Sequence, residues 1–103
     1  MSYTSYLIES YFYHLGYSQE LRERVLTRAL FLTCKKNGLE AEASRIASHY
    51  SLTEAFLPGM DRVVEEFALA VLQAHNVTLH EGIMAMKCCL FNLPAYTENG
   101  QSA

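Results

Sequence analysis

Apolar side chains recur along most of this chain at the three- and four-residue spacing of an amphipathic helix rather than alternating as they would in a strand. The clearest case begins at Met60, where Val63, Val64, Phe67 and Val71 fall on one side of a helical wheel. Only two Pro and five Gly interrupt the chain, so helices can run between them. The pattern predicts an all-α protein, a compact bundle of five or six helices.

Capping residues and helix breakers mark the expected boundaries. Gly16 suits a helix end and Ser18 suits the next helix start, whereas Ser51 and Thr78 each open an S/T-x-x-E capping box. Pro58 should end or kink the fourth helix, because proline removes an amide donor and clashes one turn back. The second and fifth helices should be central. The expected helices span about 2–15, 18–36, 39–50, 51–58, 60–75 and 78–92.

One domain accounts for the length of the chain. A protein of 103 residues can bury roughly 65% of its unfolded surface around one core. We expect residues 1–94 to form this helical domain and the polar residues 95–103 to form a flexible C-terminal tail. Charged residues make up 18% of the chain, below the usual quarter, so uncharged side chains must cover part of its surface. This favours a surface that another molecule hides.

The charge pattern disfavours nucleic acid as a partner. The formal net charge is −3, whereas binding that depends on phosphate neutralisation requires a basic surface. Positive charge is concentrated in residues 18–36, which carry a net charge of +3, and residues 37–103 carry −5. We therefore expect a basic central helix that acidic helices surround through ion pairs.

The location in the cell is predicted from missing signals and from the cysteines. No apolar run has the eighteen or so residues of a membrane span, and the first residues lack the basic start of a signal peptide. The chain has three cysteines, Cys34, Cys88 and Cys89. Neither this odd number nor their spacing suits a secreted disulfide scaffold. We expect a cytoplasmic protein with reduced thiols and no membrane partner.

Candidate chemistry is sparse. The four His and three Cys contain no C-x-x-C, H-x-x-x-H or E-x-x-H spacing that would place two metal ligands on one helix face. Glu65 and Glu66 are adjacent rather than facing, and the glycines are spread out instead of forming a phosphate-binding loop. We expect no enzyme activity, metal site or cofactor. A helical ligand or metal sensor stays open as an alternative in which His and Cys converge.

Residues 42–57 resemble a helix-turn-helix. They depart from it in three ways: Tyr50 or Ser51 occupies the turn where Gly is common, Pro58 truncates the second helix, and Glu54 stands where a base-reading side chain is usual. The same pattern fits a packing corner between helices. A DNA-binding transcriptional regulator is the first alternative function. Its contacts would be Arg45, His49 and Thr53, with Arg24 and Arg28 on phosphates.

Aromatic residues dominate the start of the chain, where five of the seven tyrosines lie within seventeen residues. These rings point around most of a helix, whereas a bundle covers one face, so some belong to the core and the others stay outside. Tyr is favoured at protein interfaces because a rigid apolar ring carries a polar hydroxyl. We expect the first helix and part of the last to contact another chain. The expected contact residues are Tyr3, Tyr6, Tyr11, Phe12, Tyr13, Tyr17, Met84, Phe91 and Leu93.

These observations favour a small, non-enzymatic protein-interaction module over the two alternatives. Such a module would act as an adaptor, a regulator or a chaperone-like protein through helix packing. Its partner would be another protein, a second copy of the chain in a homodimer, or both.

Overall fold

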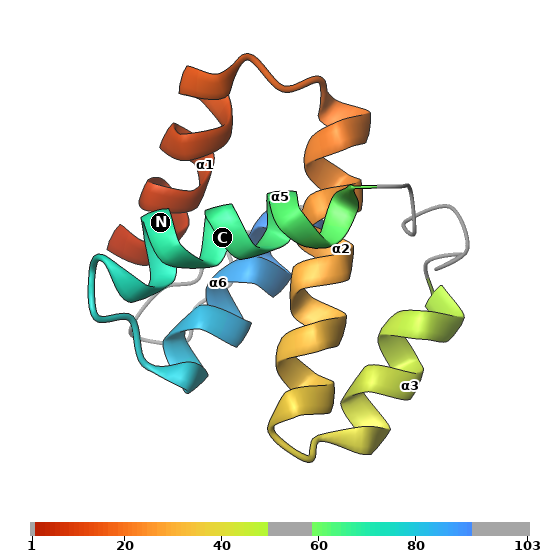
Figure 1. Ribbon diagram of the computed structural model, residues 1–103. Helices are drawn as coiled ribbons and strands as arrows, with labels where there is room; N and C mark the ends of the chain where they lie inside the picture. Colours follow the sequence, from red (N-terminus) through yellow and green to blue (C-terminus); the bar gives the residue numbers. More distant parts are fainter. Residues whose placement is uncertain (1, 50–58, 92–103) are drawn as a thin grey trace.

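The computed structural model describes residues 2–49 and 59–91, which form helices joined by short turns (Figure 1). This confirms the predicted all-α bundle. The short helix expected at 51–58 and the tail at 95–103 lie outside the described residues. The elements are α1 (Tyr3–Leu15), α2 (Gln19–Lys36), α3 (Glu40–His49), α5 (Met60–Phe67), the π-helical segment η1 (Ala68–Gln73) and α6 (Leu79–Phe91).

Local capping fixes the helix ends. The Ser18 hydroxyl accepts a hydrogen bond from the Leu21 amide, and the Thr78 hydroxyl accepts one from the Glu81 amide, both at 3.2 Å. Each bond satisfies an amide that has no partner within its own helix. Gly16 ends α1 with a φ of +70°, a backbone conformation that is strained for any residue that has a side chain. The predicted starts of α2 and α6 are confirmed.

Helix α2 lies at the centre of the bundle, as expected. It packs against α3, α5 and α6, while α1 packs against α6 and η1. In Figure 1, α5 crosses α2, and α1 lies at one edge of the molecule. The largest fully buried side chains are Phe12, Phe67, Ile8, Leu26, Leu30, Met86, Val25 and Cys34.

An aromatic cluster joins α1 to α5. The rings of Phe12 and Phe67 are stacked, with centroids 5.3 Å apart and an angle of 20° between planes. Tyr11 lies 5.6 Å from Phe67, and Tyr17 lies 5.6 Å from Phe12. Aromatic pairs at these separations stabilise a fold by roughly 0.5–1.5 kcal/mol beyond the area that they bury. The cluster therefore fixes which face of α1 turns toward the core.

The helix predicted at 60–75 is only partly α-helical. After Phe67 the backbone continues as η1, in which hydrogen bonds join residues five apart, and directly after it the Ala74 amide donates to the Leu69 carbonyl at 3.1 Å. The apolar spacing gives no sign of this change, because Phe67 and Val71 are four residues apart and both are buried. The sequence therefore predicted the helix but not its π-helical part.

Ion pairs connect the helices, and the pair between α2 and α5 is of the kind that the charge pattern predicted. Arg28 of α2 pairs with Asp61 of α5 at 2.8 Å, and Lys87 of α6 pairs with Glu42 of α3 at 3.0 Å. The guanidinium of Arg28 holds the pKa of the Asp61 carboxyl below its ordinary value through their hydrogen bond. None of the described helices combines the length and the apolar character needed to cross a bilayer.

Candidate protein-binding surface

Helix α1 has two faces of different character. Ile8 and Phe12 point into the core. On the opposite face Tyr3, Tyr6 and Tyr13 are 68%, 56% and 82% exposed. Together with the partly exposed Ser10, these rings form a row at three-, four- and three-residue spacing, which we call the tyrosine stripe. An exposed row of large rings is unusual on a helix that already buries its other face.

The structure corrects one of the predicted contact residues and divides the others. Phe12 is only 2% exposed, because its ring is stacked on Phe67 in the aromatic cluster. Tyr11 and Tyr17 are half-buried and pack against the same core. Burial raises the pKa of the Tyr11 hydroxyl, and the neighbouring Tyr17 adds to this effect. The predicted contact residues of α1 that are more than half exposed are therefore Tyr3, Tyr6 and Tyr13, the three rings of the tyrosine stripe.

The predicted contribution of the last helix is smaller than that of α1. Met84 and Phe91 are partly exposed on α6, and Phe91 also packs against the core. Leu93 lies outside the described residues. Helix α6 packs against α1, and Met84 and Phe91 are less exposed than the three rings of the stripe.

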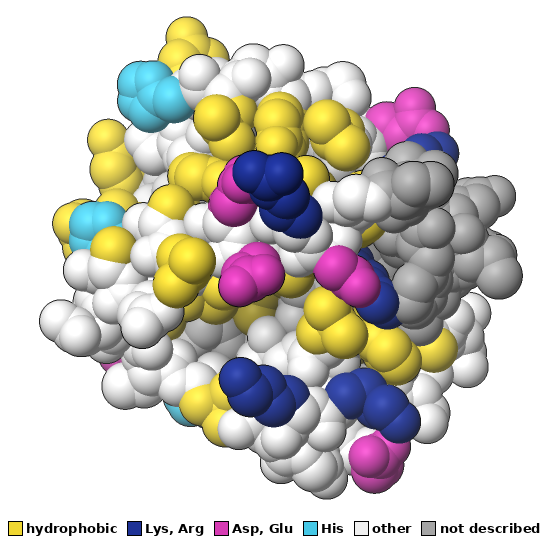
Figure 2. Space-filling view, in the orientation of Figure 1, with side chains coloured by type: hydrophobic (Ala, Val, Ile, Leu, Met, Phe, Trp, Pro, Cys, Tyr) yellow, Lys and Arg dark blue, Asp and Glu magenta, His cyan; other side chains and the backbone are white. Residues whose placement is uncertain are grey.

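The stripe meets a second exposed element at its Tyr3 end. The Tyr3 ring makes an edge contact with His75, with centroids 6.4 Å apart, just beyond η1. Leu69 of η1 is also exposed. Figure 2 shows hydrophobic and His side chains along the edge formed by α1, with the charged side chains grouped elsewhere on this face. Sequence reasoning missed Leu69 and His75, because only the folded chain brings η1 to α1.

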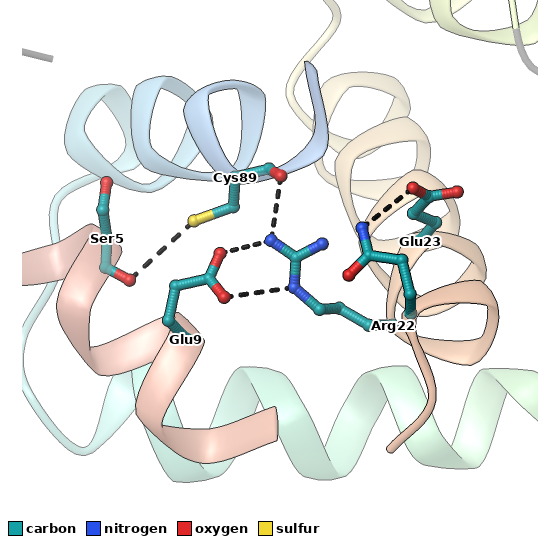
Figure 3. Close-up of polar contacts among 6 residues, drawn as sticks. Ser5, Glu9, Arg22, Glu23 and Cys89 are labelled. Carbon is teal, nitrogen blue, oxygen red and sulfur yellow. Dashed lines mark hydrogen bonds and ion pairs between the residues drawn. The ribbon is translucent and has the colours of Figure 1, made fainter. Parts of the chain in front are cut away.

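A partly buried ion pair holds α1 to its neighbours (Figure 3). Arg22 of α2 makes two hydrogen bonds to the carboxylate of Glu9 on α1, one of them from Nε at 3.2 Å. Its Nη2 also donates to the Cys89 carbonyl of α6 at 3.0 Å. The remaining Nη1 is buried, and no acceptor within the described residues bonds to it. Arg22 therefore joins three helices while neutralising Glu9, the one Asp or Glu of α1.

The buried thiol beside this ion pair is poorly suited to nucleophilic chemistry. Cys89 Sγ donates to the Ser5 carbonyl at 3.8 Å. Burial raises the pKa of the Cys89 thiol to about 12, and the charge of Glu9 acts in the same direction. A thiol needs to ionise to attack, so Cys89 stays inert near neutral pH.

The basic residues considered for DNA are engaged by carboxylates. Arg28 has a side chain only 10% exposed, in its pair with Asp61. Arg24 pairs with Glu20 at 2.7 Å, one turn away on the same helix. Each carboxylate offsets the charge of its guanidinium and would repel a phosphate brought to the same place. This arrangement disfavours α2 as a phosphate-binding helix.

The helix-turn-helix resemblance gains little from the described residues. Arg45 is exposed but pairs with Glu42 on its own helix at 2.9 Å. Thr53 and the side chain of His49 lie outside the described residues, as do the proposed turn and the second helix. The DNA-binding alternative therefore stays a prediction from the sequence.

The metal-sensor alternative requires His, Cys, Asp or Glu side chains to converge. In the part of the chain that the structure describes, no three of them do so.

Comparison of the chain with models of protein families, with curated proteins and with solved structures gave no match. The function is therefore argued from the surface of the molecule.

Proposed function

We propose that this chain is a non-enzymatic protein-interaction module that binds another protein through the tyrosine stripe. The observation that carries the proposal is the exposure of Tyr3, Tyr6 and Tyr13 on a helix whose other face is already packed. Removing large apolar surfaces from water is favourable, and a Tyr side chain loses little conformational entropy when its ring is buried in an interface. Adaptors, regulators and chaperone-like proteins use contacts of this kind.

The thiols favour a reducing compartment such as the cytoplasm. Cys34, Cys88 and Cys89 are all free, and two of them are buried. Secreted domains of this size commonly rely on disulfides, whereas cytosolic proteins keep their thiols reduced. We therefore propose that the chain acts in the cytoplasm.

Site-specific photo-crosslinking in the cells that make the protein tests the proposal. Benzoylphenylalanine is placed at Tyr6 or Tyr13, and a matched control carries it at Arg62, whose side chain is 85% exposed on α5. We expect protein adducts from positions 6 and 13 in excess over position 62. Equal or absent adducts at the three positions would overturn the proposal, provided that circular dichroism shows the helix content of the unmodified protein.

A further inference from the structure

We infer that the partner of the tyrosine stripe is a second copy of this chain, paired so that the two α1 helices run antiparallel. The inference rests on the proposed function, since both need the stripe to be a contact surface. In this pairing Tyr6 of each copy packs over Ser10 of the other, and Tyr3 packs against Tyr13. The two-fold axis passes between the two helices at the level of Ile8, whose side chain faces the core of its own copy.

The order of large and small residues in the stripe favours this direction. The three-, four-, three-residue spacing is that of a seam between two packed helices. Ser10 is its one small member. Antiparallel pairing places each Ser10 opposite a Tyr6 ring, so every layer contains at least one ring. Parallel pairing would set Ser10 against Ser10 and leave an underfilled layer, which forfeits dispersion contacts on both sides.

The charges beside the stripe permit two copies to approach. Helix α1 contains no Lys or Arg, and its one acidic residue is Glu9, next to Ile8 at the level of the axis. Self-pairing brings the two Glu9 side chains to the same flank. Each is already bonded to Arg22 of its own copy, so like-charge repulsion is reduced. Antiparallel helices also place opposite dipole ends together.

The exposed area predicts a weak dimer. A Tyr side chain buries about 150–250 Å² when it leaves water completely. With the exposed fractions of Tyr3, Tyr6 and Tyr13, the three rings supply about 300–500 Å² per copy, against about 800 Å² per partner in a standard interface. The half-buried Leu7 and the exposed His14 lie on one flank and add to this. The dimer should therefore dissociate on dilution.

Sedimentation equilibrium of the full chain over a concentration series tests the pairing. We expect the mass to rise from one to two subunits with concentration. Ser10→Tyr should weaken association at least tenfold, because its ring occupies the space of the partner's Tyr6, and Ser10→Ala should leave it unchanged. Parallel pairing predicts the reverse for Ser10→Tyr, because the new ring fills the underfilled layer. Circular dichroism checks that each variant keeps its helix content.

Disulfide trapping in a Cys88→Ala background tests the register. On oxidation, a mixture of Tyr6→Cys and Ser10→Cys proteins should form a mixed dimer. Either variant alone should not, since identical positions are then offset along the axis by about 6 Å, too far for a disulfide. A single subunit mass at all concentrations, or disulfides formed mainly by each variant alone, would overturn the inference. If position 13 then crosslinks only to a different protein, the proposed function stands without it.

Discussion

Replacing Arg22 by Met should destabilise the protein by about 1–2 kcal/mol. Met fills much of the space of the Arg stem, so the substitution removes the charge and the hydrogen bonds but limits the loss of packing. The guanidinium bonds Glu9 on α1 and the Cys89 carbonyl on α6. Its loss therefore weakens two helix contacts at once.

The magnitude follows from the exposure of each partner. The Arg22 side chain is 12% exposed and that of Glu9 is 38% exposed, so water can solvate the carboxylate that is left behind. This limits the loss from the ion pair to about 1 kcal/mol. The Cys89 carbonyl lies in the last turn of α6, where a cation adds about 0.3–1 kcal/mol. Losing that hydrogen bond costs about 1 kcal/mol more.

One feature of the site opposes this loss. The buried Nη1 of Arg22 has no acceptor among the described residues, and removing an unsatisfied donor returns about 1 kcal/mol. The net destabilisation corresponds to a Tm lower by about 4–16 °C in a domain of this size. Thermal and urea unfolding followed by circular dichroism measure both quantities.

The matched control is Arg24→Met, because Arg24 bonds Glu20 on the same helix at the surface. Its effect should stay within about 0.5 kcal/mol. A double-mutant cycle with Glu9→Gln should then show a coupling energy between Arg22 and Glu9. An Arg22→Met protein as stable as Arg24→Met, or more stable than the wild type, would refute the reasoning, because the unsatisfied donor would then outweigh the bonds.

Three further predictions concern pH, thiol reactivity and a helix end. The hydrogen bond from Lys87 holds the pKa of Glu42 in the folded protein below its ordinary value of 4.5. The stability that this pair provides is therefore present above pH 4.5 and is lost as the pH falls through the pKa of the folded state. Urea unfolding at a series of pH values should show this loss, and Glu42→Gln should reduce the dependence of stability on pH. Burial raises the pKa of the Cys89 thiol to about 12. Iodoacetamide at neutral pH should therefore modify the partly exposed Cys88 in the native protein and leave Cys89 unmodified, which peptide mass spectrometry can measure. Equal modification of the two thiols would contradict the packing. Gly16→Ala should lower the free energy of unfolding by about 1–2 kcal/mol, because alanine is strained at a φ of +70°. No neighbouring atom would clash with the added methyl group, so the backbone strain is the whole cost. An unchanged Tm would contradict that conformation.

Helix starts could be predicted from the sequence because capping is local. Ser18 and Thr78 stand three residues before the amides that they accept from, and no distant residue is needed. The central position of α2 was predictable for a related reason. Its basic residues lie close together in the sequence. The helix that pairs with acidic neighbours can therefore be identified without knowing where those neighbours lie in the fold.

The orientation of α1 could not be predicted in the same way. Its aromatic residues surround the helix, so no polar face indicates which side meets solvent. Phe12 and Tyr13 are adjacent and both aromatic, yet one stacks on Phe67 and the other is mostly exposed. The choice depends on packing against α5, which lies almost fifty residues later in the chain.

The Arg22 contacts and the neighbours of Tyr3 share this dependence on distant segments. Cys89, which accepts from Arg22, is 67 residues away in sequence. His75 reaches Tyr3 only because the chain turns after η1. No spacing rule within one helix encodes either contact.

The π-helical segment has a consequence for how the chain length can vary. A π turn holds about one residue more than an α turn, so η1 amounts to a one-residue insertion accommodated within a helix. Deleting one residue between 68 and 73 would let the backbone run on as an α-helix while the flanking segments keep their azimuth. The same deletion in α2 would rotate every later side chain by about 100° and carry the core face to the outside. Homologues that are one residue shorter should therefore carry their gap in η1.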